Sequence, residues 1–209
     1  MYNRLFAGLL AATLFLLTGQ PGSAADGDKV GKVLRLKSIA SAVQAATPRP
    51  LHIGADIMVG DVISTGKDTR LEFSLKDGST VTLGADTTFA VDDFSDAPAR
   101  ESIAMRMLTG AFAATSGRIA AINPDAMTVS TAVATIGIRG TTVWGGRLTD
   151  DFEVALLAGR AVRVTTQAGS VELTTVGSGT SIASGDVAPT APVDWAPAKI
   201  SQARATFEF

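Results

Sequence analysis

Short runs of alternating apolar and polar residues constrain the fold of this sequence more than any other feature. Glycine and turn residues separate these runs roughly every ten positions. The clearest example is residues 70–83, where two such runs flank an Asp77-Gly78 turn. A period of two is typical of strands that bury one face. Because no long segment has a convincing helical pattern, we expect an all-β sandwich or barrel of short strands.

The loop of this hairpin can be predicted from the parity of its two runs. A two-residue loop at Asp77-Gly78 would place Phe73 opposite Thr82, an apolar residue across from a polar one. A three-residue loop with Gly78 in the left-handed conformation would instead pair Phe73 with Val81. If both runs face the same core, burial of one face favours the three-residue loop.

A second run, residues 131–146, has the composition of a strand but contains Gly137 and Gly140. Glycine inside a strand indicates a bulge or the close approach of another backbone. Arg139 lies between them, and a cation among apolar neighbours is expected to pair with a carboxylate or with backbone carbonyls. We therefore predict that Arg139 is largely buried and paired, and that it fixes a bulge around the two glycines. The alternative is an exposed Arg139 that binds an anionic ligand.

The remaining segments are expected to add short strands and turns. We expect a first strand over Val33–Val43 and a polar, turn-rich segment over Ala85–Ala99. Ser102–Leu108 favours a strand, with a short amphipathic helix as the alternative. Phe152–Val164 is interpreted as a hairpin that turns at Ala158-Gly159, because valines run toward and away from this dipeptide.

The two ends of the sequence are expected to lie outside the β domain. Arg4 precedes an apolar run over Leu5–Leu17, and small residues follow it, so residues 1–24 are predicted to be a cleavable signal peptide. An uncleaved anchor is the alternative, but the run is shorter than the roughly 20 residues that span a bilayer. We expect a periplasmic or secreted protein with no stable membrane insertion. At the other end, Ala198–Phe209 could form a short helix.

Charge and composition exclude several classes of protein. The net charge is −2 and there is no basic block, which argues against nucleic-acid binding. The absence of cysteine excludes disulfides and thiolate chemistry. His52 is the only histidine, which removes most catalytic triads and histidine metal sites, and we expect a structural role for it.

The acidic residues Asp92, Asp93 and Asp96 are a candidate calcium site, since carboxylates are the ligands that Ca²⁺ prefers. Their spacing matches no complete calcium loop, so a solvated turn is the favoured interpretation. We expect no metal and no cofactor. No nucleophile is placed with a base, and we therefore expect a protein that is not an enzyme.

Four segments, taken in order, resemble the characteristic motifs of the FecR family of periplasmic signalling domains: Gly60–Gly66, Leu75–Leu83, Thr131–Thr141 and Phe152–Val164. They lie within about residues 54–185. We place the β domain at residues 33–186 and a proline-rich tail at residues 187–209. The resemblance implies a jelly-roll-like β-sandwich that binds partners. Its motif residues, with a structural or interaction role, are Asp77, Gly78, Gly137, Arg139, Gly140 and Thr141.

In the best-known members of this family, a cytoplasmic anti-sigma segment and one membrane span precede the domain. The periplasmic part there receives a signal from an outer-membrane transporter. Only four residues precede the apolar run of this sequence, so we do not expect it to control a sigma factor alone.

We expect instead an exported interaction domain, with another envelope protein as its partner, that acts in signalling, sensing or scaffolding. The alternative is a module that binds envelope glycan or a small ligand, for which Trp144 and Trp195 are the available aromatic residues.

Overall fold

In the part of the chain that the structure describes, the regular secondary structure is β-strand, as predicted, apart from two short helices. The computed structural model describes residues 27–123 and 125–209, so the predicted signal peptide at residues 1–24 lies outside the described part. Within these two ranges, no helix has the length and apolar character needed to cross a membrane.

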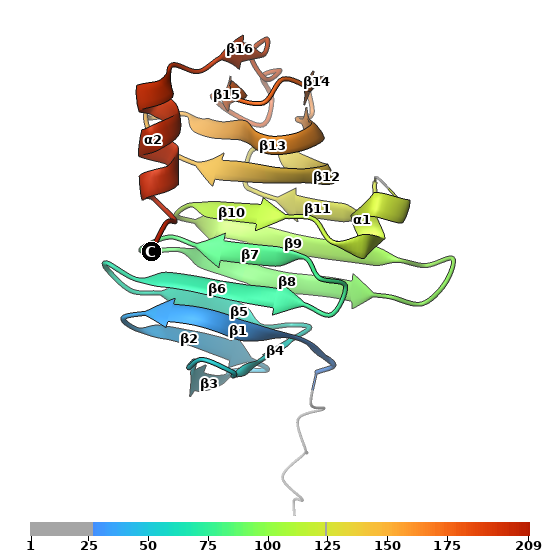
Figure 1. Ribbon diagram of the computed structural model, residues 1–209, viewed down its shortest axis with the longest axis vertical. Helices are drawn as coiled ribbons and strands as arrows, with labels where there is room; N and C mark the ends of the chain where they lie inside the picture. The colour runs from blue at the N-terminus through green and yellow to red at the C-terminus, as the bar shows by residue number, and fades with distance from the viewer. Residues whose placement is uncertain (1–26, 124) are drawn as a thin grey trace, which may run out of the picture.

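The strands form one hydrogen-bonded sheet that curls into two facing layers (Figure 1). The first layer contains β4 (Asp56–Met58), β1 (Lys29–Lys37), β6 (Arg70–Leu75), β7 (Thr80–Leu83) and β10 (Phe112–Thr115). The second contains β3 (Thr47–Pro50), β2 (Ala40–Gln44), β5 (Val62–Thr65), β8 (Thr88–Ser95), β9 (Ser102–Thr109) and β11 (Met127–Ser130). The remaining elements are β12 (Thr135–Gly146), β13 (Phe152–Thr165), β14 (Ser170–Leu173), β15 (Ser178–Ile182), β16 (Val193–Asp194), α1 (Arg118–Ile122) and α2 (Pro197–Ala205).

The core lies between the two layers and is filled by the alternate residues of each strand. Phe89 of β8 contacts Phe73 of β6 edge to face, with ring centroids 6.5 Å apart. It also packs against Phe112 of β10, at 5.8 Å. Both partners belong to the opposite layer, so these three buried rings join the layers. Aromatic pairs in such geometries add about 1 kcal/mol to the energy of burial.

The hairpin of β6 and β7 has the predicted three-residue loop. Phe73 pairs with Val81, and Gly78 adopts a φ of +88°. The parity argument is therefore confirmed, because both strands do bury the same face.

The entry corner before β5 is held by a buried acidic residue. Gly60 turns with a φ of +88°, and the fully buried Asp61 follows it. The Asp61 carboxylate accepts a hydrogen bond from the backbone N–H of Met58, at 2.8 Å, and pairs with Arg49 of β3 at 2.5 Å. The corner thereby ties the edge strand β3 to the start of β5.

β12 and β13 form a long two-stranded ribbon that belongs to both layers. The first half of β12 pairs with β11, where Gly137 lies opposite Thr128. Its second half pairs with β10, where Thr142 lies opposite Thr115. On the other side of the ribbon, β13 pairs with β15 in its first half and with β14 in its second. The ribbon thus passes from one layer to the other near its middle.

The ribbon bends at two glycines that lie side by side. Gly140 has a φ of +61° and Gly159 a φ of +96°, values that residues with a Cβ rarely adopt. A Cβ on Gly159 would also overlap the carbonyl oxygen of Gly140. The inward-facing positions of β12 change at the bend: Ile138 is buried before it and Thr141 after it. Gly140 therefore lets one strand serve two layers.

Two predictions about this ribbon are wrong in detail. Phe152–Val164 is not a hairpin, because β13 continues through Gly159 while paired with β12. The register between β12 and β13 is regular around Gly140 and shifts between Thr142 and Val143, where Leu157 is the additional residue. The bulge therefore lies beyond Gly137 and Gly140, around which it was predicted.

Two other segments also differ from expectation, and a short helix adds to the strands. The predicted first strand, Val33–Val43, is two strands, β1 and β2, separated by Ser38 with a φ of +70°. The segment Ala85–Ala99 contains β8 and not only turns. Residues 118–122 form α1, whereas Ser102–Leu108 is a strand as favoured.

The C-terminal strap, residues 195–209, packs across the ends of the ribbon strands (Figure 1). Its Trp195 meets Trp144 of β12 edge to face at 5.9 Å. Lys199 forms a 2.6 Å ion pair with Glu153 of β13, whose side chain is 1% exposed. Thr206 accepts a hydrogen bond from Nε1 of Trp144 at 2.8 Å. The expected terminal helix, α2, is confirmed and is part of the packed structure.

Replacement of Lys199 by alanine is expected to destabilise the protein by about 3 kcal/mol, because the carboxylate of Glu153 would stay buried without a cation. The measurement is urea unfolding. Lys37→Ala, at an exposed position, is the control, and Glu153→Gln with Lys199→Met should recover most of the loss. A cost for Lys199→Ala equal to that of Lys37→Ala would contradict a buried ion pair.

Gly159→Ala is expected to cost roughly 3 kcal/mol or more, because strained backbone and steric overlap add together. Gly177 is the matched control: its φ is +90°, but a Cβ there would have no heavy atom within 4 Å. Gly177→Ala should therefore cost only about 1 kcal/mol, from the conformation alone. If thermal unfolding showed the same loss of stability for Gly159→Ala and Gly177→Ala, the close approach of β12 and β13 would not contribute to the cost.

Candidate functional site

The predicted motif residues are brought together by residues 116–122, the segment that contains α1. Asp77 and Gly78 lie in the β6–β7 loop, while Gly137, Arg139, Gly140 and Thr141 lie on β12. The segment 116–122 contacts both groups.

The β6–β7 loop holds the first turn of α1. Gly117, the residue before this helix, has no side chain with which to cap it. The carbonyl of Asp77 accepts from the N–H of Arg118 at 2.9 Å, and its carboxylate accepts from the N–H of Ile119 at 3.4 Å. The hydroxyl of Ser79 accepts from the N–H of Gly117 at 2.8 Å. The loop thus satisfies the free N–H groups at the start of the helix.

Ser79 is absent from the site residues predicted from the sequence. Its side chain is fully buried, and besides holding Gly117 it donates to the Asp77 carboxylate at 2.8 Å. The only signal in the sequence is its place directly after the Asp77-Gly78 turn. The helix that it holds is distant in sequence, and this is why the role is not apparent there.

Thr141 holds Ser116, the first residue of the segment. Its N–H donates to the hydroxyl of Ser116 at 2.9 Å, and its carbonyl accepts from the N–H of Ser116 at 3.0 Å. The hydroxyl of Thr141 donates across the ribbon to the carbonyl of Ala158. The bend at Gly140 is therefore fixed on both sides by hydrogen bonds.

Arg139 is paired with acidic residues, as predicted, but it is not largely buried. Its Nη1 lies 3.2 Å from Oε1 of Glu172, and its Nε lies 4.0 Å from Oδ1 of Asp125. The side chain remains 29% exposed. The physical reason is that side chains alternate along a strand. Ile136 and Ile138 face the core, so Arg139 faces outward.

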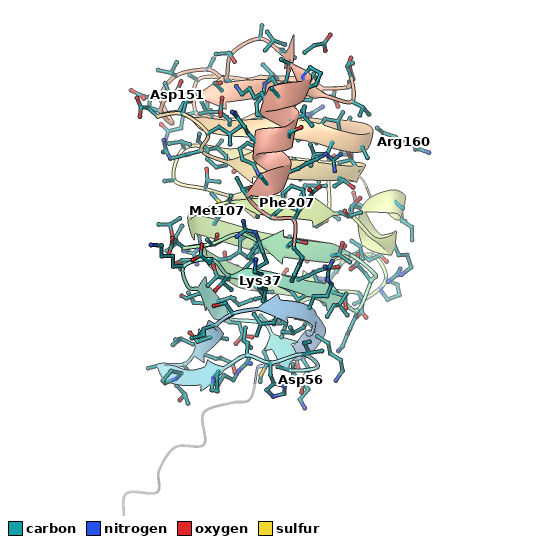
Figure 2. All side chains as sticks on the ribbon, turned by 60° about the vertical axis from the view of Figure 1, so that its left-hand side comes forward. Lys37, Asp56, Met107, Asp151, Arg160 and Phe207 are labelled. Carbon is teal, nitrogen blue, oxygen red and sulfur yellow. The ribbon has the colours of Figure 1, made fainter. Side chains whose placement is uncertain are left out.

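A pocket of about 450 Å³ lies between α1 and the bend of the ribbon. Its lining consists of Ala120, Ala121, Arg139, Gly140, Arg160 and Ala161. Four of these residues have at most a methyl side chain, so the two guanidinium groups dominate its chemistry. Arg160 is exposed, and within residues 27–123 and 125–209 it has no acidic partner. Figure 2 shows this side chain projecting outward from the sheet.

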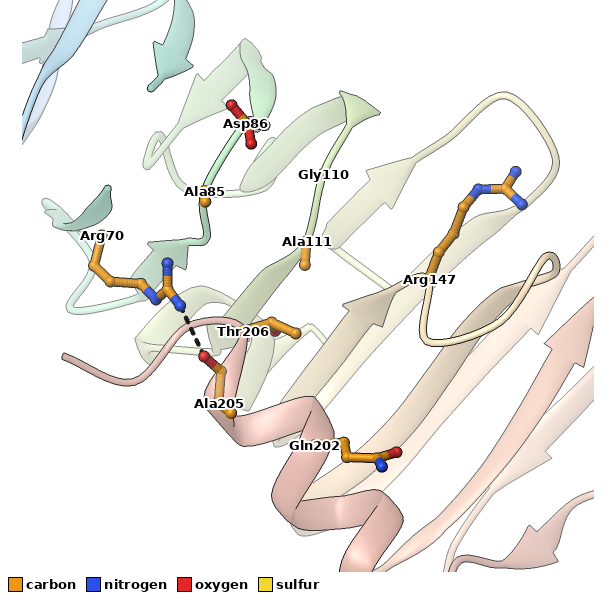
Figure 3. Close-up of a pocket in the computed structure, with 9 residues that line it drawn as sticks. All are labelled: Arg70, Ala85, Asp86, Gly110, Ala111, Arg147, Gln202, Ala205 and Thr206. Carbon is orange, nitrogen blue, oxygen red and sulfur yellow. Dashed lines mark hydrogen bonds between the residues drawn. The ribbon is translucent and has the colours of Figure 1, made fainter. Parts of the chain in front are cut away.

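A larger hollow, about 630 Å³, lies where the C-terminal strap crosses the ends of the strands (Figure 3). Both of its arginines and the hydroxyl of Thr206 are already bonded within the protein. Arg70 donates to the carbonyl of Ala205 at 2.8 Å, and Arg147 donates to the carbonyl of Asp150. The hydroxyl of Thr206 donates to the carbonyl of Ala203 at 2.6 Å. The smaller pocket is therefore the better candidate for binding.

The other residues considered from the sequence are placed elsewhere. His52 is exposed in a turn, with Nδ1 3.0 Å from the carbonyl oxygen of Ile53. Asp92 and Asp93 belong to strand β8 and not to a turn. Asp92 pairs with Arg106 at 2.7 Å, and this hydrogen-bonded pair raises the pKa of the guanidinium. No group of acidic and histidine side chains in the part of the chain described here could hold a metal ion.

The two tryptophans do not form an exposed platform for a sugar. Trp144 is fully buried and Trp195 is 8% exposed, because Trp195 of the C-terminal strap packs against Trp144 of β12. The aromatic residues on which a glycan-binding interpretation depends are therefore used in packing.

Comparison with known proteins gives one family and one fold. The family model described as FecR protein matches residues 61–172. Two crystal structures of "a putative anti-sigma factor" from Parabacteroides distasonis, at 2.50 and 1.65 Å resolution, are similar, with TM-scores of 0.52 and 0.51. Both are 15% identical to this chain and cover 67% of it, and the chain spans 62% of each of them. This likeness shows a shared fold. No curated protein matches the sequence.

Asp77→Ala is expected to destabilise the protein by about 2 kcal/mol, because the lost carboxylate accepts from the N–H of Ile119 in the first turn of α1 and from the N–H and hydroxyl of Ser79. Amide hydrogen exchange should rise first at residues 117–119, before the strands are affected. Asp96→Ala, which removes an exposed carboxylate in a loop, is the control and should change neither quantity. Unchanged exchange at residues 117–119 would show that the loop does not hold the helix.

Proposed function

The chain belongs to the FecR protein family, and from this premise we propose that it is an exported domain of the cell envelope that acts by contact with another protein. Its role would be in signalling, sensing or scaffolding. The family match covers the segment with all six predicted motif residues. The description of the similar structures as anti-sigma factors also supports a regulatory role.

The architecture supports a jelly-roll-like β-sandwich as the framework of this domain. Two layers face each other, and β12 and β13 pass between them. Export to the periplasm or beyond is supported by the features of residues 1–24 in the sequence. We assign the interaction domain to residues 33–186.

The observation that carries the proposal is how the polar motif residues are used. Asp77, Ser79 and Thr141 direct their side chains to backbone groups or to each other. They hold the segment 116–122 against the bend, and the one hydroxyl among them that meets a carboxylate, Ser79 beside Asp77, is fully buried and out of reach of a substrate. What the arrangement offers is a rigid outer surface with a pocket between two arginines. Such a surface supports binding and not turnover.

Site-specific photocrosslinking in intact cells tests this proposal. A benzophenone amino acid in place of Ala121, at the rim of the pocket, is expected to give a discrete adduct with another envelope protein. The same group at Ile53, which is 65% exposed in a turn between β3 and β4 and away from α1 (Figure 1), is the control and should give none. If no position across the exposed surface gave an adduct, action through protein contact would be wrong.

A further inference from the structure

We propose that the pocket between α1 and the bend of the ribbon receives an acidic side chain, aspartate or glutamate, from an exposed segment of the partner protein. This inference rests on the proposed function and names the chemistry of the contact. It depends on the cations of the pocket, on its floor and on its rim.

The cations of the pocket are available to a ligand. Arg160 is exposed and forms no ion pair within the described ranges. Arg139 is engaged on one side by Glu172 at 3.2 Å, whereas its contact with Asp125 is at 4.0 Å and involves a carboxylate that is 76% exposed. An incoming carboxylate can replace this last contact at little cost. The planar guanidinium also binds a carboxylate through two parallel hydrogen bonds.

The floor of the pocket is open because its residues are small. Gly140 has no Cβ, and the nearest heavy atom to the place where one would be is Cδ of Arg160, at 3.9 Å. Ala161 continues this floor along β13, and Ala120 closes it on the side of α1. A side chain of the partner can therefore reach the backbone of the bend between the two guanidinium groups.

The rim of the pocket points to a polypeptide rather than to a larger polyanion. Ala121 and Ile122 of α1 are exposed, and Ile122 is 63% accessible, so they offer apolar contact beside the cations. Nucleic acids and anionic membranes need an extended basic surface. Here Glu172 and Asp125 flank the arginines. Glu172 also lies opposite Arg163, the next arginine along β13, so acidic residues interrupt the basic area. One acidic side chain with an apolar neighbour fits both features.

Binding of a fluorescein-labelled hexaglutamate peptide, measured by fluorescence anisotropy, tests the chemistry of the pocket. Arg160→Glu should weaken binding about tenfold or more, as expected when a charge-assisted contact is reversed. Lys37→Glu makes the same change of charge at an exposed position on β1, distant from the pocket (Figure 2), and should leave binding unchanged. Hexalysine should not bind.

Three results would overturn the proposal in this experiment. The first is equal binding by the wild-type protein and Arg160→Glu, or no binding at all by the wild type. The second is competition by inorganic phosphate at the concentration of the peptide's carboxylates, which would indicate a site for small anions. The third is stronger binding to phosphatidylglycerol vesicles than to hexaglutamate, also lost in Arg160→Glu, which would indicate a membrane surface.

The crosslink from position 121 separates this proposal from the proposed function. Loss of the adduct in Arg160→Glu, with retention in Lys37→Glu, is the expected result. If the adduct persists in Arg160→Glu, the protein contact stands but the acidic docking is wrong. If the wild type gives no adduct from any surface position, the proposed function itself fails.

Discussion

The fold depends on one backbone constraint, the bend of the β12–β13 ribbon at Gly140 and Gly159. Both residues have positive φ, and their backbones approach so closely that a Cβ on Gly159 has no room. Without this bend, β12 could pair with β10 or with β11 but not with both. The inward-facing positions of β12 change parity at Gly140, so each half of the strand buries its apolar residues in its own layer.

The motif residues gain their roles from the need to fix this bend. Thr141 is tied to Ser116, and the Asp77 loop is tied to the first turn of α1. The pocket exists because the helix is held a short distance from the bent ribbon and because small residues line the gap. The pocket is therefore a consequence of how α1 is held against the ribbon. The residues that hold α1 in place need not be the ones that bind a ligand.

Local patterns predict the parts of this fold that depend on neighbours in sequence. The hairpin loop follows from the parity of the runs around Gly78, and the acidic partner of Arg139 follows from the cost of an unpaired cation. The exposure of Arg139 and the continuity of β13 through Gly159 depend on the pairing of β12 with β13. This pairing cannot be predicted from the local sequence pattern. The place of Arg160 in the pocket carries no signal in the sequence, because it depends on the position of Arg160 beside Gly140 of the neighbouring strand.

The shared ribbon also determines the order in which the chain can fold. The two layers are joined through β12, which pairs with β11 before the bend and with β10 after it, so they stay unconnected until this strand has been made. The pairing of β12 with β10 brings together residues that are distant in sequence, such as Phe112 and Gly145, and pairings of this kind are slow to form. A polypeptide of this design therefore keeps its two layers separate while most of its length is being made.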